Sequence, residues 1–310
     1  MPSATYIVHN SKQCIGNHPT MSHRIWIDQL SFSDGSEFSL GADDIVVFVG
    51  PNNSGKSAAL RGIRDKVVNP NNPNPVIQNL SVALQGDRED LATWLLKSSR
   101  IVPEPPSNPR YAGFGADVHH DHAIGYWTNS KNGLHGLAPF FCRLLNADER
   151  LGAANPANNI SLTKDAPSHP IHFLQRDEKV ELGISKQFRK AFGEDLIVHH
   201  NAGNIVPLYM GLRPMPKEGT DRISLDYITQ LEELPTLHTH GDGMRSFTGI
   251  LLYASVGRES ILLVDEPEAF LHPPQARLLG RMLVNNKRSD RQLFISTHNG
   301  DCLLYTSRCV

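Results

Sequence analysis

Gly50-Pro-Asn-Asn-Ser-Gly-Lys-Ser57 matches the pattern G-x4-G-K-[ST]. It follows Ile45–Val49, a run of β-branched and aromatic residues typical of a strand buried on both faces, and it precedes residues 58–66, which we expect to be helical. Glycines let such a loop turn tightly, so that successive N–H groups and the N-terminus of the next helix point at one anion. The segment therefore predicts a phosphate-binding loop, built from Gly50, Pro51, Asn52, Asn53, Ser54, Gly55, Lys56 and Ser57.

Two side chains of this loop have chemistry of their own. Lys56 would bring a positive charge to the β- and γ-phosphates of a nucleotide, and the hydroxyl of Ser57 would be a ligand of Mg²⁺. The alternative is an ordinary turn rich in Gly and Asn with an exposed lysine. The strand before the segment and the helix after it favour the phosphate loop.

A second buried strand, residues 261–264, ends in Asp265-Glu266-Pro267. In an open α/β sheet, ligands bind beyond the carboxyl ends of the strands. Asp265 would hold Mg²⁺ through its water shell, and Glu266 would orient and polarise an attacking water. An acidic turn after a strand is common by itself, but the phosphate loop upstream favours the catalytic interpretation.

The other segments of the chain differ in hydrophobic spacing and in their content of Pro and Asn. Arg24–Phe32 alternates as a half-buried strand does, and Asp34-Gly35 follows as a turn. Residues 243–254 and 274–285 have helical spacing, and residues 292–296 read as another buried strand, so the alternation predicts an α/β sheet with parallel strands. Between these parts lie Pro- and Asn-rich pieces at 69–75, 102–109 and 167–170, with helices expected at 90–99, 136–145 and 183–192. We therefore expect three regions: 1–66 and 236–310 as the two halves of one domain, and 67–235 as an insertion or helical subdomain.

Composition narrows the class of protein. With 30 Lys+Arg against 32 Asp+Glu among 310 residues, a broadly basic nucleic-acid binder is excluded, although a local basic patch is not. No apolar run approaches the length of a membrane-spanning helix, and no secretory signal is visible at the start. The four cysteines lack metal or disulfide spacing, and Cys142 lies in an apolar run that predicts a core position. These features indicate a cytoplasmic protein without a membrane partner.

Val264-Asp-Glu-Pro-Glu-Ala-Phe-Leu-His-Pro273 resembles the Walker B motif and D-loop of ABC-type ATPase heads, in the branch of RecF-like, SMC-like and OLD-like proteins. His240-Gly-Asp-Gly-Met-Arg-Ser246 stands where the signature motif of that family stands, and Ser296-Thr-His-Asn299 resembles its switch-histidine motif. The likeness covers residues 24–66 and 236–300. It implies an α/β P-loop fold of the ABC-ATPase type, with a mixed sheet, flanking helices and a large insertion between Walker A and the signature motif.

The resemblance also implies a mechanism. Heads of this family pair across two ATP molecules, each bound with Mg²⁺, so we expect an ATP-dependent homodimer. The signature helix of one protomer faces the γ-phosphate held by the other, a role that falls here on Gly241, Gly243, Arg245 and Ser246. His298 would contact the γ-phosphate and position the water beside Glu266, and His272 would lie at the dimer seam.

Some positions depart from the family pattern or stay open. Gly241 replaces the signature serine of transporters, so that hydroxyl contact is absent or supplied elsewhere. The Q-loop glutamine could be Gln78, Gln85 or Gln175. Gly241-Asp-Gly243 could also be an ordinary turn, and His298 a structural histidine. His119-His-Asp-His122 could bind a metal, but adjacent residues on a strand point to opposite faces, which favours a solvated loop over a metal site.

The end of the chain suggests a fragment. Cys302-Leu-Leu-Tyr-Thr-Ser-Arg-Cys-Val310 resembles a translated sequencing-adapter end, so we expect native sequence to stop near Asp301 and a C-terminal region to be missing. OLD-like proteins carry a nuclease domain after the head, which makes DNA or a nuclease a possible partner.

The sequence thus predicts an ATPase that couples hydrolysis to a conformational switch in DNA maintenance or anti-phage defence. Two alternatives remain: an ATPase subunit of an ABC transporter, for which the LSGGQ-like motif and a clear Q-loop are missing, and a nucleotide-gated module that binds a protein partner.

Overall fold

The computed structural model describes residues 5–9, 22–102, 108–285 and 287–298. The chain forms two compact units. The first consists of 1–146, 258–267 and 280–310, and the second of 147–257 and 268–279. The expected insertion at 67–235 is therefore divided, because residues 67–146 belong to the first unit and 147–235 to the second. The proposed adapter end at 302–310 lies outside the described residues.

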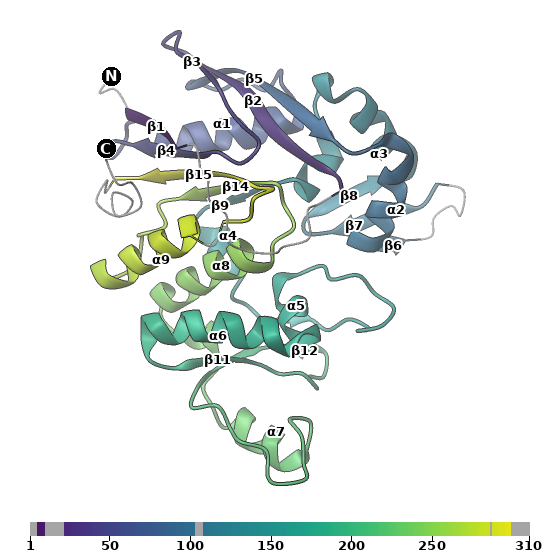
Figure 1. The fold of residues 1–310 in the computed structure, drawn as a ribbon, viewed down its shortest axis with the longest axis vertical. Coiled ribbons are helices and arrows are strands. Elements are labelled where there is room, and N and C mark those ends of the chain that lie inside the picture. Colours follow the sequence, from purple (N-terminus) through teal and green to yellow (C-terminus); the bar gives the residue numbers. More distant parts are fainter. Residues whose placement is uncertain (1–4, 10–21, 103–107, 286, 299–310) are drawn as a thin grey trace. The chain divides into compact units, whose positions relative to one another are not determined.

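The first unit is built on a five-stranded sheet. Its order is β1 (Thr5–His9), β4 (Ile45–Val49), β15 (Gln292–Thr297), β14 (Ile261–Asp265) and β9 (Cys142–Leu145), shown in Figure 1. β4, β15, β14 and β9 run parallel, and β1 pairs antiparallel with β4. The parallel strands are the continuous apolar runs of the sequence, and their burial explains why they do not alternate. The mixed α/β fold is confirmed.

One expected helix is wrong. Residues 136–145 form a 3₁₀ helix, η2 (His135–Phe140), followed by β9, which pairs in parallel with β14 through Cys142 and Leu144. Pro139 cannot donate a backbone hydrogen bond in a long α-helix, and a short apolar run suits a buried strand equally well. As expected, Cys142 is buried, and this burial raises the pKa of its thiol to about 12.

Two smaller sheets complete the strands of the first unit. One is antiparallel, in the order β3 (Glu37–Ser39), β2 (Arg24–Phe32) and β5 (Ile77–Gln85), and the other is β6 (Arg100–Val102), β7 (Arg110–Gly113) and β8 (Ala116–His119). A side chain of β15 connects β2 to the main sheet. The carboxamide of Gln292 accepts from Ile27 N–H at 2.8 Å and donates to Ile27 C=O at 2.9 Å, so it pairs with the backbone of β2 as a neighbouring strand would.

Helices of the first unit are α1 (Lys56–Val68), α2 (Arg88–Ser98) and α3 (His120–Thr128), with a short 3₁₀ turn, η1 (Ser130–Asn132). α1 buries Leu60 and Ile63 in the same core as Phe48 and Phe294 of the main sheet. Trp94 of α2 stacks on Phe141 with ring centroids 5.0 Å apart. The packing of Leu60 and Ile63 fixes α1, and with it the loop that precedes it, against the sheet.

The second unit is mostly helical. It holds α4 (Ala147–Gly152), α5 (Pro170–Arg176), α6 (Glu178–Phe192), α7 (Leu225–Glu232), η3 (Leu237–Thr239) and α8 (Asp242–Val256), with the strand pairs β10 (Ala157–Asn158) with β12 (Ile205–Val206) and β11 (Asp195–Val198) with β13 (Leu208–Gly211). α9 (Pro273–Asn285) begins in this unit and ends in the first. Within the described ranges, no helix has the length and apolar character needed to cross a membrane.

Candidate phosphate-binding site

The carboxyl ends of three parallel strands meet at one edge of the main sheet. Val49 of β4 is level with Thr297 of β15, and Ser296 is level with Asp265 of β14. The loop after β4, the acidic turn after β14 and His298 after β15 therefore leave the sheet from the same edge. This is the edge at which ligands bind in open α/β sheets.

The loop at 50–55 adopts left-handed backbone conformations at two positions. Gly55, the N-cap of α1, has φ +91°, and Asn53 has φ +63°. A Cβ on Gly55 would also lie 3.2 Å from Cγ2 of Val76. The turn thus favours glycine at this position, and a side chain there would also press against Val76.

Lys56 folds back over the loop. Its ammonium donates hydrogen bonds to Gly50 C=O and Pro51 C=O, both at 2.8 Å, and the residue is only 4% exposed. Its positive charge is therefore held beside the backbone of the loop that precedes α1.

Ser57 and Asp265 face each other. The Ser57 hydroxyl donates to Oδ1 of Asp265 at 2.9 Å, and the Ser296 hydroxyl donates to the same oxygen. A serine hydroxyl beside a carboxylate supplies the hard oxygen ligands that Mg²⁺ prefers, so this pair fits the expected metal site. Ser296, which was quoted above only as part of the switch-histidine motif at 296–299, belongs to this group with Ser57 and Asp265.

Glu266 lies directly after Asp265 with a left-handed backbone, φ +46°. Such a conformation costs a residue other than glycine roughly 1–3 kcal/mol and persists only where its surroundings hold it. Its N–H donates to Ser296 C=O at 3.0 Å and also approaches Ser296 Oγ at 3.2 Å. His298 is exposed at the end of β15. The catalytic roles of Glu266 and His298 stay predictions.

In the second unit, the segment at 241–246 opens α8. Gly241 is the exposed N-cap, and a Cβ on Gly243 would lie 2.6 Å from Phe270 C=O. Arg245 pairs with Asp242 at 3.2 Å and donates to Asn155 Oδ1 at 3.3 Å. Ser246 is fully buried, so its hydroxyl is not presented at the surface of the helix. The four residues therefore do not form one exposed group.

The D-loop-like segment lies against the start of α8. Phe270 is 54% exposed and has a left-handed backbone with φ +69°. The guanidinium of the buried Arg150 lies over its ring, with Cζ 5.8 Å from the ring centroid. His272, which was expected at a dimer seam, is exposed. The structure thus joins the 268–272 segment to the signature-like segment within one unit.

The glutamine of the Q-loop remains unassigned. Gln78 and Gln85 lie on β5, and the side chain of Gln85 accepts a hydrogen bond from Arg24. Gln175 is buried in the second unit and donates to Asn159 Oδ1 at 3.3 Å.

The histidine-rich segment 119–122 lies at the end of β8 and the start of α3. Its His120 shares a hydrogen bond of 3.0 Å with Tyr111 OH. In the described part of the chain, no group of three or more His, Cys, Asp or Glu side chains is placed to hold a metal.

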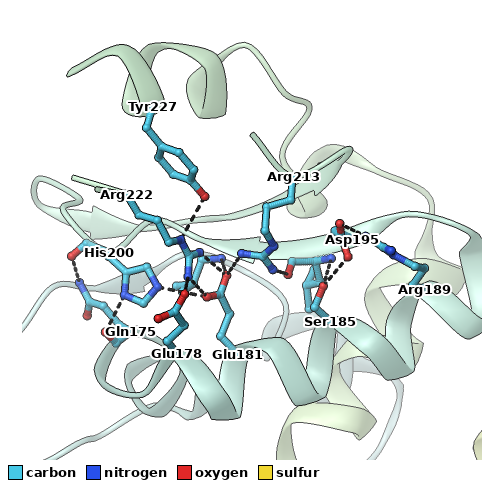
Figure 2. A network of polar contacts seen from close by, with 12 residues as sticks. Gln175, Glu178, Glu181, Ser185, Arg189, Asp195, His200, Arg213, Arg222 and Tyr227 are labelled. Atoms are coloured by element: carbon cyan, nitrogen blue, oxygen red, sulfur yellow. Dashed lines mark hydrogen bonds and ion pairs between the residues drawn. The ribbon is translucent and has the colours of Figure 1, made fainter. Parts of the chain in front are cut away.

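A buried ion cluster in the second unit was not predicted. Figure 2 shows Glu181 of α6 at its centre, contacted by Arg213, Arg222 and His200. Burial would raise the pKa of Glu181, but hydrogen bonds from His200 and Arg222 and the charge of Arg213 outweigh it and lower the pKa to about 2. These partners are spread along the sequence from 200 to 222, so no local pattern could have revealed them.

Comparison with solved structures shows which fold the chain shares. A solved Smc head bound to the C-terminal winged-helix domain of ScpA overlaps with a TM-score of 0.50 over 91% of this chain and 92% of that chain at 13% identity, which shows a shared fold. The Smc head of Pyrococcus furiosus with an extended coiled coil reaches a TM-score of 0.48 at 11% identity over the same shares.

Sequence comparison adds a relative and a family. An uncharacterized protein of Methanocaldococcus jannaschii is 35% identical over 60 residues, which are 19% of this chain, and the chain spans about half the length of that curated relative. A family model described as "AAA domain, putative AbiEii toxin, Type IV TA system" matches residues 147–303, about half of the chain, and leaves the phosphate loop outside the match. The chain belongs to this family of AAA-domain ATPases and has the P-loop fold of SMC heads.

Proposed function

We propose that the chain binds ATP with Mg²⁺ and hydrolyses its β–γ phosphoanhydride bond. The observation that carries the proposal is the meeting of Ser57 and Asp265, 2.9 Å apart, directly beside the glycine-rich loop and Lys56. Phosphate loop, lysine, hydroxyl and carboxylate are the set that phosphoryl transfer requires, and here they come from the loop and helix that follow β4 and from the end of β14.

Each residue of the site has a proposed role in binding or hydrolysis. Backbone N–H groups of the loop and the N-terminus of α1 bind the phosphates, and Lys56 neutralises their charge. Ser57 and Asp265 would hold Mg²⁺, which neutralises charge on the β- and γ-oxygens. Glu266 orients the attacking water and accepts its proton, and His298 contacts the γ-phosphate from the neighbouring strand end.

We further propose an ATP-dependent homodimer in which α8 of one protomer faces the nucleotide of the other. An exposed glycine N-cap supports this arrangement, since backbone N–H groups at a helix N-terminus stabilise anionic charge. Gly241 and Gly243 would bring that backbone close, and Arg245, held by Asp242, would add positive charge. Because Ser246 is buried, we leave it out of the proposed contact.

The biological setting follows from resemblance. From the likeness of its motifs to RecF-like, SMC-like and OLD-like heads, we propose a role in anti-phage defence or DNA maintenance in the cytoplasm, with DNA or a nuclease as partner. The family description, which names a "putative AbiEii toxin" of a type IV TA system, adds a toxin–antitoxin setting to this proposal. We propose that hydrolysis drives a conformational switch in the dimer that is passed on to that partner.

The decisive experiment measures ATP turnover and oligomeric state for the wild type, Lys56→Ala and Glu266→Gln. We expect turnover in the wild type, no nucleotide binding by Lys56→Ala, and nucleotide-bound dimers without turnover for Glu266→Gln. Normal hydrolysis by Glu266→Gln would contradict the mechanism. Dimerisation without turnover in the wild type would instead support a nucleotide-gated interaction module.

A further inference from the structure

We infer that Ser296 is a positioning residue that orders Asp265 and Glu266 together through one hydroxyl. The inference rests on the proposed function, because it deepens the account of the same site. Ser296 itself would touch neither the nucleotide nor the metal. Its role is to fix the carboxylate proposed to hold Mg²⁺ and the backbone of the residue proposed to activate water.

The register of the sheet places Ser296 between these two residues. It is level with Asp265 on the neighbouring parallel strand and is fully buried. Its hydroxyl donates to Oδ1 of Asp265, and the N–H of Glu266 approaches the same hydroxyl oxygen at 3.2 Å. Because a hydroxyl has one hydrogen and two lone pairs, both contacts can be made at once only in this sense: Ser296 accepts from Glu266 and donates to Asp265.

Asp265 Oδ1 then receives two donors, Ser57 from α1 and Ser296 from β15. Two donors from different elements fix the plane of the carboxylate better than one, which suits a ligand that must meet a metal in a set orientation. The Ser57 hydroxyl is itself a proposed metal ligand, whereas Ser296 contacts the carboxylate without being a proposed metal ligand.

Glu266 gains from the same hydroxyl in another way. Its left-handed backbone must be held in place by its surroundings, and its N–H contacts Ser296 twice, at the carbonyl and at the hydroxyl. An alanine at position 296 would keep the carbonyl contact, which belongs to the sheet, and would lose only the hydroxyl.

Ser296→Ala tests the inference with little risk to folding, because it removes one atom from a buried site. We expect kcat to fall about tenfold, the size of effect that loss of a hydrogen bond to a charged group produces. The Mg²⁺ concentration for half-maximal turnover should rise several-fold, while nucleotide binding in EDTA stays at the wild-type value. The rise in Tm that Mg²⁺ adds to the protein with a non-hydrolysable ATP analogue should shrink, which gives a readout that needs no activity.

Ser260→Ala is the matched control. Ser260 is also buried, directly before β14 begins, and its hydroxyl accepts from Ile25 N–H at 3.0 Å. This variant should lose a comparable amount of stability without changing kcat or the magnesium response. If Ser296→Ala does not fold, Ser296→Cys keeps a weak donor of similar size and should show the same changes in smaller measure.

An unchanged magnesium response in Ser296→Ala, whatever its turnover, would overturn the inference. A wild type without ATPase activity would count against the proposed function alone, since the magnesium-dependent Tm shift can still be compared between the variants.

Discussion

Ser57 and Asp265 are joined by a hydrogen bond of 2.9 Å although 208 positions separate them in the sequence. Ser57 lies in the first turn of the helix after the phosphate loop, and Asp265 ends β14, which β15 separates from β4 in the sheet. The pair shows how the fold brings two motifs to one place. It also gives the first test of the site, since a direct contact predicts energetic coupling.

A double-mutant cycle with Ser57→Ala and Asp265→Asn should show coupling of about 1–2 kcal/mol in the free energy of unfolding, measured by urea denaturation in EDTA. Each single variant should also lose most magnesium-dependent turnover. The control cycle pairs Asp265→Asn with Ser54→Ala, a serine of the same loop, and should show no coupling. Equal coupling in both cycles would mean that the contact has no specific energy.

Gly55→Ala should weaken nucleotide binding more than it weakens the fold. The substitution places a side chain at φ +91° and 3.2 Å from Val76, so the loop must shift and its N–H groups turn away from the phosphates. Gly35→Ala is the control, because Gly35 has φ +87° with nothing within 4 Å of an added Cβ. It should cost about 1 kcal/mol of stability with unchanged affinity for ATP, measured by calorimetry. Equal affinity losses in both variants would contradict the role of the loop.

The Glu181 cluster predicts acid sensitivity of the second unit. The pKa of Glu181 is lowered from 4.5 to about 2, so its contribution to stability is complete above pH 4.5 and is lost as the pH falls toward 2. The shift corresponds to roughly 3 kcal/mol in the free energy of unfolding. Glu181→Gln should remove this part of the pH dependence and destabilise the unit by about 3–5 kcal/mol at pH 7, measured by urea denaturation.

Glu178→Gln is the control for that cluster. Glu178 lies on the same helix and pairs with the same Arg222, but its side chain is 60% exposed, so its loss should cost under about 1 kcal/mol. Figure 2 shows both carboxylates beside Arg222. Similar losses for the two variants would show that burial of Glu181 does not set its contribution.

What the sequence reveals depends on how far apart the interacting residues are. The phosphate loop and the acidic strand end are local patterns, and their neighbouring apolar runs mark parallel strands, so β4, β14, β15 and the motif positions were predictable, whereas β1 was not. The apolar run before Leu145 was misread as a helix, because only pairing with β14 distinguishes a buried strand from a buried helix of that length. Ser296 and Glu181 act through partners on other elements, and no spacing in the sequence announces such contacts.

Two helices of the second unit differ in how their glycines tolerate a side chain. In α8, a Cβ on Gly249 would lie 2.0 Å from Arg150 C=O, so α4 can approach α8 only because position 249 has no side chain. Gly249→Ala should therefore destabilise the protein by about 1–3 kcal/mol or more, although alanine is the better helix former.

Gly183→Ala in α6 reverses the sign. No atom lies within 4 Å of a Cβ at Gly183, so the gain in helix propensity is unopposed and should stabilise the protein by about 0.5–1 kcal/mol. Thermal denaturation of the two variants beside the wild type gives the comparison directly. A raised Tm for Gly249→Ala would contradict this packing argument, because it would mean that α4 can move away from α8 at no cost in stability. The contact of Arg150, on α4, with Phe270 would then contribute little to holding the 268–272 segment.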